Sequence, residues 1–96
     1  MTKTYNVEQH LPNWLVDNAD QIFTDILESC ELHVTTGNDT FGILKIRSIS
    51  GITEFTVAGK ESAINVLQKS ERFFVNCEKY ELAARARDCG KLWESI

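Results

Sequence analysis

The sequence predicts a single α+β domain over residues 1–96: an N-terminal helix, a three-stranded antiparallel β-meander and a C-terminal helical hairpin packed on one sheet face. Three observations predict this order. Apolar residues recur at three- and four-residue spacing as far as Cys30, alternate from Glu31 to Ala58, and return to helical spacing after Gly59. A chain of 96 residues supplies one hydrophobic core, because domains typically run to about 100–150 residues.

The first predicted helix spans Asn13 to Cys30. Two starts remain open: Pro12 or Asn13 in the first turn, or Asn18 as the N-cap with Gln21 as its capping-box partner. The opposite face is acidic. The apolar stripe consists of Leu15, Ala19, Ile22, Phe23, Ile26, Leu27 and Cys30.

The alternating segment predicts three strands joined by two tight turns, one at residues 37–39 and one at Ser50-Gly51. Both turns place the same side chains inside, and this agreement sets the register. The inner residues are Leu32, Val34, Leu44, Ile46, Phe55 and Val57. The second turn pairs Ile49 with Ile52, Arg47 with Glu54, Ile46 with Phe55, and Leu44 with Val57.

The other face of the predicted sheet is mixed in character. It carries His33, Thr35, Phe41, Ile43, Lys45, Arg47, Glu54 and Thr56. One interpretation is a partner surface, with Phe41, Lys45 and Arg47 as an alternative nucleic-acid-binding set. The other is that the apolar members lie under an N-terminal segment in which Tyr5 and Val7 add a further strand.

After Gly59 the sequence predicts a helical hairpin over about residues 62–94, with its joint at Asn76. The apolar residues of its first helix are Ala63, Ile64, Leu67 and Phe74. Those of its second helix are Tyr80, Ala83, Ala84, Ala86 and Trp93.

The stretch from Ile64 to Glu94 contains the run Tyr80-Glu81-Leu82-Ala83-Ala84-Arg85-Ala86-Arg87-Asp88. This run resembles the aromatic-Glu-x-Ala-Ala-x-Leu-Arg-Asp core of the UVR domain, the short helical hairpin of nucleotide-excision-repair subunits. The resemblance covers about a third of the chain. Ala86 and Gly90 depart from it, because the family has large aliphatic residues at both positions.

The resemblance implies a non-catalytic regulatory or adaptor protein that contacts another protein, like or unlike itself, through the hairpin. We expect Tyr80 to anchor the hairpin, Ala83 and Ala84 to allow close helix approach, and Arg87-Asp88 to make charge-assisted bonds across it. The expected partner-binding residues are Tyr80, Glu81, Ala84, Arg85, Arg87, Asp88 and Lys91.

The charge of the chain is unevenly distributed. The formal net charge is −4, which argues against a protein that coats nucleic acid. Residues 1–40 hold seven acidic residues and one lysine, a net −6, whereas residues 41–96 hold nine basic and seven acidic residues, a net +2. An inhibitor whose acidic helix mimics nucleic acid is therefore a further alternative.

The sequence offers no recognisable catalytic motif, and we expect neither enzyme activity nor a cofactor. Cys30 and His33 have the spacing of two metal ligands, but no second local pair completes a site, so no metal is expected. Residues 59–62 only faintly resemble a phosphate-binding turn. Three cysteines without a C-x-x-C motif favour a reducing cytoplasm. Neither a signal peptide nor a membrane span is evident.

Overall fold

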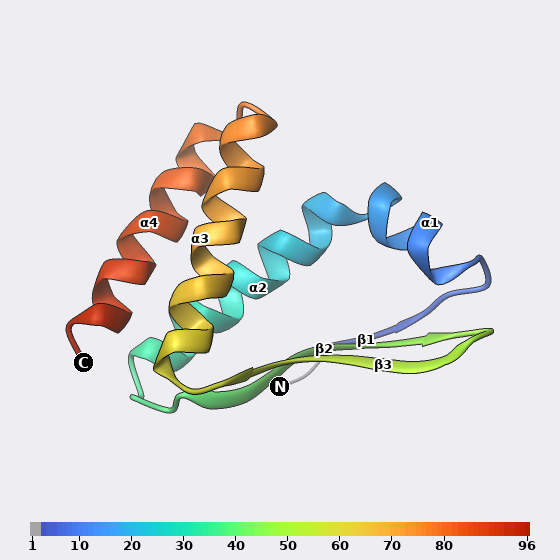
Figure 1. The fold of residues 1–96 in the computed structure, drawn as a ribbon, viewed down its shortest axis with the longest axis horizontal. Coiled ribbons are helices and arrows are strands. Elements are labelled where there is room, and N and C mark those ends of the chain that lie inside the picture. The colour runs from blue at the N-terminus through green and yellow to red at the C-terminus, as the bar shows by residue number, and fades with distance from the viewer. Residues whose placement is uncertain (1–2) are drawn as a thin grey trace.

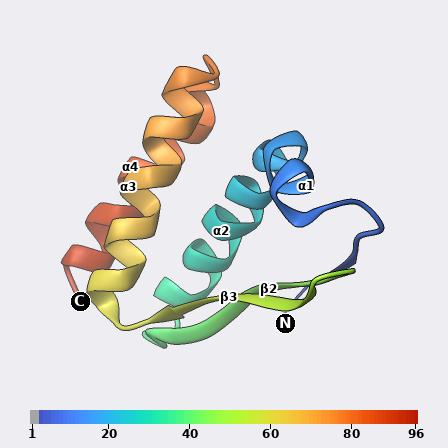
Figure 2. The ribbon, with the colours of Figure 1, turned by 45° about the vertical axis from the view of Figure 1, so that its right-hand side comes forward.

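The computed structural model describes residues 3–96, which form four helices and one three-stranded mixed sheet (Figure 1). The elements in chain order are β1 (Lys3–Asn6), α1 (Leu11–Asp17), α2 (Ala19–Val34), β2 (Thr40–Ser48), β3 (Gly51–Ala58), α3 (Lys60–Asn76) and α4 (Tyr80–Glu94). The predicted α+β class is confirmed. The helices all lie on one side of the sheet (Figures 1 and 2).

The predicted N-terminal helix is two helices with a break at Asn18. Pro12 lies in the first turn of α1, and Asn18 precedes α2 with φ −115° and ψ 20°. The Asn18 side chain donates a hydrogen bond back to the Trp14 carbonyl oxygen at 2.9 Å and does not cap α2. Both starts that the sequence offered therefore mark real helices, but the expected capping box is absent.

The predicted first strand of the meander is wrong, because α2 continues through this segment to Val34. Leu27 and Cys30 are fully buried, and Val34 extends the same helical spacing into the core cluster. Leu32, predicted to be inside, is 59% exposed. Burial of one helix stripe thus outweighs the β-branched composition at the end of α2.

The third strand of the sheet comes from the N-terminus instead. β1 pairs with β2 in parallel, with Lys3 opposite Leu44 and Tyr5 opposite Ile46. The Val7 amide continues the pairing with a 2.7 Å hydrogen bond to the Arg47 carbonyl oxygen. Parallel strands need a long crossover connection, and α1 and α2 supply it. The sheet is therefore mixed, in the order β1-β2-β3.

The hairpin between β2 and β3 is shifted by two residues from the predicted register. Ser48 pairs with Gly51 and Leu44 with Phe55, so the loop is Ile49-Ser50. The Ser48 side chain binds within this turn, where it accepts from the Ser50 amide at 3.2 Å. A two-residue shift preserves the alternation of faces, so Leu44, Phe55 and the other inner residues of these strands keep their predicted side.

A β-bulge between Gly42 and Leu44 then reverses the predicted side of two residues. Ile43 and Leu44 are both buried at this irregularity, and Phe41 also faces the helices. A bulge inserts one unpaired residue and so changes which residues face the core. The prediction that Phe41 and Ile43 lie on the outer face is wrong.

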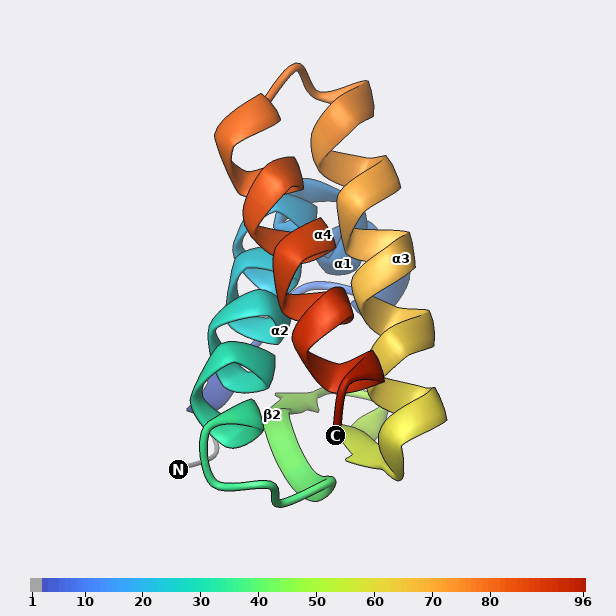
Figure 3. The same ribbon diagram turned by 90° about the vertical axis from the view of Figure 1, so that its left-hand side faces the viewer.

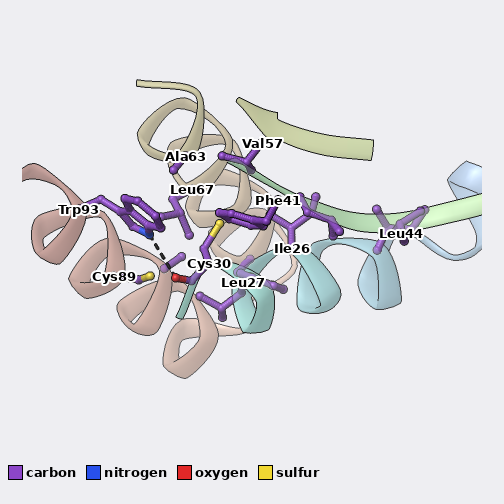
Figure 4. Close-up of a cluster of buried hydrophobic side chains, with 14 of the residues drawn as sticks. Ile26, Leu27, Cys30, Phe41, Leu44, Val57, Ala63, Leu67, Cys89 and Trp93 are labelled. Carbon is purple, nitrogen blue, oxygen red and sulfur yellow. Dashed lines mark hydrogen bonds between the residues drawn. The ribbon is translucent and has the colours of Figure 1, made fainter. Parts of the chain in front are cut away.

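The helices α3 and α4 lie side by side and extend away from the sheet (Figures 1 and 3). α3 ends at Asn76, where the joint was predicted. The left-handed residue of the connection is Glu78, with φ 59°, and not an asparagine. The start of α3 and the end of α4 lie nearest the sheet. There Trp93 of α4 and Phe41 of β2 belong to one hydrophobic core (Figure 4).

Candidate protein-binding surface

The buried side of α4 consists of Ala83, Ala86, Cys89 and Trp93. Trp93 is fully buried, and its Nε1 donates a 3.1 Å hydrogen bond to the carbonyl oxygen of Cys30 on α2 (Figure 4). Its ring also stacks near Phe41, with centroids 6.1 Å apart. One aromatic residue thus ties α4 to both α2 and β2. This contact positions the exposed side of the hairpin.

Small residues line the seam between α3 and α4. Ala83 and Ala86 are buried, whereas Ala84 is only half-buried. Ala86 borders the groove between the two helices together with Ile64 and Leu67 of α3, and the close helix approach at Ala83 and Ala84 stays a prediction.

Most of the predicted partner-binding residues are exposed on α4. Tyr80, Glu81, Arg87, Asp88 and Lys91 all lie on its surface. Tyr80 is 62% exposed, so the expectation that it anchors the hairpin core is wrong. Phe74 at the end of α3 is fully buried and anchors the core of the hairpin instead. Tyr80 is instead a large apolar side chain available for contact.

Arg85 is the predicted site residue that forms an ion pair with another helix of the same chain. Its Nε and Nη2 donate to the two carboxylate oxygens of Glu31 on α2, at 3.2 and 2.6 Å. The hydrogen bond with Glu31 raises the pKa of the Arg85 guanidinium above its ordinary value. This fork-to-fork geometry orients both groups. Arg85 therefore joins α4 to α2, and about half of its side chain stays exposed.

The Arg87-Asp88 pair does not bridge the hairpin as expected. Arg87 Nε lies 3.2 Å from Asp88 Oδ1, so the contact joins two neighbours on the same helix. Both side chains are at least half exposed. Exposed pairs of this kind contribute about 0–1 kcal/mol to stability and remain open to exchange with a partner's charges.

A groove of about 170 Å³ runs between α3 and α4. Its lining consists of Ile64, Leu67, Gln68, Glu71, Ala86, Arg87, Gly90, Lys91 and Glu94. A Cβ placed on Gly90 would meet no atom within 4 Å. The two positions where the sequence lacks the aliphatic residues of the UVR family, Ala86 and Gly90, thus border the same hollow.

The alternative nucleic-acid-binding set is separated by the fold. Phe41 is buried and stacks on His33 at 4.0 Å, on the helix side of the sheet. Lys45 remains on the open face, where its Nζ lies 3.3 Å from a Glu54 carboxylate oxygen. Arg47 is exposed on the same face. The structure therefore brings the two cations together without the aromatic residue that would stack on a base.

The turn at Gly59 is also engaged within the chain. The Gly59 amide donates to the Asp39 carbonyl oxygen at 2.7 Å. Lys60 Nζ donates to the carbonyl oxygens of Glu94 and Ile96 at 3.1 and 2.8 Å. Lys60, the first residue of α3, thus binds free carbonyl groups at and just after the C-terminal end of α4. The two groups best placed to bind a phosphate at this turn are therefore occupied.

The acidic face of α2 is partly matched by cations of the same chain. Besides Glu31, Asp20 lies 2.9 Å from Lys79 Nζ. The exposed Glu28 of this face has no ion pair within residues 3–96. An acidic helix used to mimic nucleic acid would need its carboxylates free, and two of these carboxylates are in contact with cations.

Sequence reasoning missed a buried polar cluster around Asp25, which is only 2% exposed. Its carboxylate accepts hydrogen bonds from Lys3, from the Tyr5 hydroxyl and from Gln21 Nε2. The sequence did contain a signal, because Asp25 lies three residues after Ile22 on the apolar side of the predicted helix. Its partners Lys3 and Tyr5 lie on β1. The sequence left open whether this N-terminal segment forms a strand, so the contact could not be predicted.

The two buried thiols show no sign of activation. Burial raises the pKa of Cys30 to about 12 and that of Cys89 to about 11. Cys77 is exposed at the α3–α4 joint. Within residues 3–96, no group of three or more His, Cys, Asp and Glu side chains is arranged to hold a metal ion.

None of the helices described is long and apolar enough to cross a lipid bilayer. Comparison of the chain with protein-family models, with curated proteins and with solved structures finds no match.

Proposed function

We propose that this protein is a small non-catalytic adaptor or regulatory protein that binds another protein through the α3–α4 hairpin. The observation that carries the proposal is the groove between α3 and α4. It combines an apolar floor, formed by Ile64, Leu67, Ala86 and Gly90, with a charged rim. Interfaces of this type place an apolar anchor in a pocket and surround it with polar contacts.

The exposed flank of α4 extends this surface along the helix. Tyr80, Ala84, Arg87, Lys91 and Glu94 follow one another at spacings of four and three residues, so they share one side of α4. Tyr80 and Arg87 belong to residue types that are enriched at energetically important interface positions. The resemblance to the UVR hairpin points to four of these residues, Tyr80, Ala84, Arg87 and Lys91.

The proposal is tested by affinity capture from cell lysate, followed by mass spectrometry, with a double variant Arg87→Glu/Lys91→Glu. We expect this variant to lose the proteins that the wild type captures while keeping its melting temperature, because exposed substitutions rarely cost more than about 0.5 kcal/mol. The matched control is Lys69→Glu, an exposed charge reversal on α3 outside the groove lining. Equal capture by wild type and the double variant would refute the proposal.

A further inference from the structure

β3 is a free edge of the sheet. The strand order is β1-β2-β3, so among residues 3–96 β3 has a neighbouring strand on one side only (Figure 1). β3 runs for eight residues from Gly51 to Ala58, whereas the other edge strand, β1, has four. A strand edge presents a row of unpaired N–H and C=O groups that can pair with another chain.

Apart from one charged residue, Glu54, the usual protections of an edge are missing from β3. It contains no proline, and the bulge of this hairpin lies in β2. Its single charged residue, Glu54, lies against Lys45 on the neighbouring strand. Side chains bind its backbone only at the ends, where the Ala58 amide donates to Ser62 Oγ and the Gly51 carbonyl accepts from Ser48 Oγ. The centre of the edge is open for pairing.

The helix-facing side of β3 is covered at one end only. α3 begins directly after β3 and packs over the end that contains Val57, which is 1% exposed. On the same side Thr53 and Phe55 are only half-buried. The half of β3 remote from α3 therefore lacks a covering element.

We infer that β3 pairs with β3 of a second copy of this chain, antiparallel and about a two-fold axis. An antiparallel pair of identical strands is self-complementary, as a two-fold interface requires. With Phe55 opposite itself, Glu54 lies opposite Thr56 of the other copy, so like charges do not meet. In the same register Val57, which α3 covers, lies opposite the uncovered Thr53 of the other copy.

This arrangement supplies what each copy lacks. The two sheets become one six-stranded sheet, and the two-fold axis, perpendicular to it, keeps the helices of both copies on the same side. A short extended peptide could satisfy the same backbone groups. It would bring no helix to cover Thr53 and Phe55, and the second copy is therefore the better fit.

The test is sedimentation equilibrium of the full chain over a wide concentration range. We expect a species of twice the 10.9 kDa chain mass. Thr56→Glu places a carboxylate opposite Glu54 of the other copy, twice by symmetry, and should weaken self-association by about tenfold. Thr56→Lys places a cation there and should strengthen it. Thr4→Glu, an exposed change on β1, is the matched control and should leave self-association unchanged.

Three results would each overturn the inference: a single-chain mass at every concentration, equal effects of the two Thr56 variants, or loss of the dimer in Arg87→Glu/Lys91→Glu but not in Thr56→Glu. The last result would place self-association on the hairpin. Because Thr56 and the groove are separate surfaces, Thr56→Glu should still capture the hairpin's partners. The two proposals can therefore fail independently.

Discussion

Asp25 is the residue whose environment departs furthest from that of an ordinary surface carboxylate. It is buried on α2, and hydrogen bonds from Lys3 and Tyr5 of β1 and from Gln21 of α2 converge on it. A buried carboxylate is tolerated when donors satisfy it, and hydrogen bonds to charged groups contribute about 1.5–3 kcal/mol. Asp25 therefore joins the short strand β1 to the helical layer.

We expect Asp25→Ala to lower the free energy of unfolding by about 2–3 kcal/mol, because it removes the acceptor and leaves the Tyr5 hydroxyl without its partner. Urea titration followed by circular dichroism measures the change. Glu28→Ala, an exposed change on the same helix, is the control and should stay within about 0.5 kcal/mol of wild type. A loss no larger than that of the control would show that the cluster does not hold β1.

We expect the two buried thiols, Cys30 and Cys89, to lower the free energy of unfolding as pH becomes alkaline. In the unfolded chain Cys30 and Cys89 lose their protons near the ordinary pKa of 9.0, whereas burial raises their pKa to about 12 and about 11 in the native state. The native state then holds more protons, so the contribution of these groups is complete below pH 9 and is lost as pH rises toward 12. The pKa values of Lys3 and Tyr5 are raised as well and act in the same direction.

We therefore expect the free energy of unfolding to decline steadily as pH rises above 9, the ordinary pKa of these thiols. Urea titrations at successive pH values measure the decline, and Cys30→Ala should make it shallower. A free energy that stays constant over this range would contradict the assignment of both thiols to the core.

At the scale of elements, the α3–α4 pair keeps a glycine that its own packing does not need. Gly90 lies inside α4, and a Cβ there would meet open space. Glycine in a helix interior costs about 0.5–1 kcal/mol relative to alanine. Ala86, one turn earlier, borders the same groove. The small residues Ala86 and Gly90 thus leave this groove unfilled.

We expect Gly90→Ala to raise the free energy of unfolding by about 0.5–1 kcal/mol, since it removes the propensity cost without a clash. Thermal melts measure the gain. Ala86→Leu extends the test, because a UVR-like hairpin has room for the aliphatic side chain, which should add about 0.5–2 kcal/mol. If Ala86→Leu instead destabilised the protein by more than about 1 kcal/mol, overpacking would be indicated and the resemblance would be one of composition.

At the scale of the whole molecule, cations outside the acidic α1–α2 region form ion pairs with α2. Arg85 contacts Glu31, Lys79 contacts Asp20, and both cations come from the C-terminal half of the chain. The uneven charge distribution of the sequence is therefore partly an internal complementarity between α2 and the hairpin. Exposed pairs of this kind each contribute about 0–1 kcal/mol to stability.

We expect Arg85→Glu to cost about 1 kcal/mol, because it places two carboxylates where a cation met one. The exchange Glu31→Arg combined with Arg85→Glu should recover most of the loss, which a double-mutant cycle by urea titration measures. If the double variant were as unstable as the sum of the two single variants, the pair would not be coupled.

Much of the fold was predictable where a pattern is local. The stripe through Ile22, Ile26 and Cys30 predicts α2, and the alternation on either side of Ser50 predicts the β2–β3 hairpin. The joint at Asn76 predicts the end of α3. In each case the periodicity of the chain and one or two turn residues carry the information. The exposure of Glu81 and Lys91 on α4 follows from the same helical periodicity.

What remained was decided by contacts between distant segments. Residues 31–34 continue α2, and the indole of Trp93, about sixty residues later, hydrogen-bonds the Cys30 carbonyl just before them. Phe41 packs beside Trp93, and β1 contacts α2 through Asp25. Local propensities in these segments differ by only about 1 kcal/mol, whereas burying one large side chain contributes about 1.5–3 kcal/mol. The sequence by itself determined the elements with a clear period, and tertiary packing chose among the alternatives where the local preference was small.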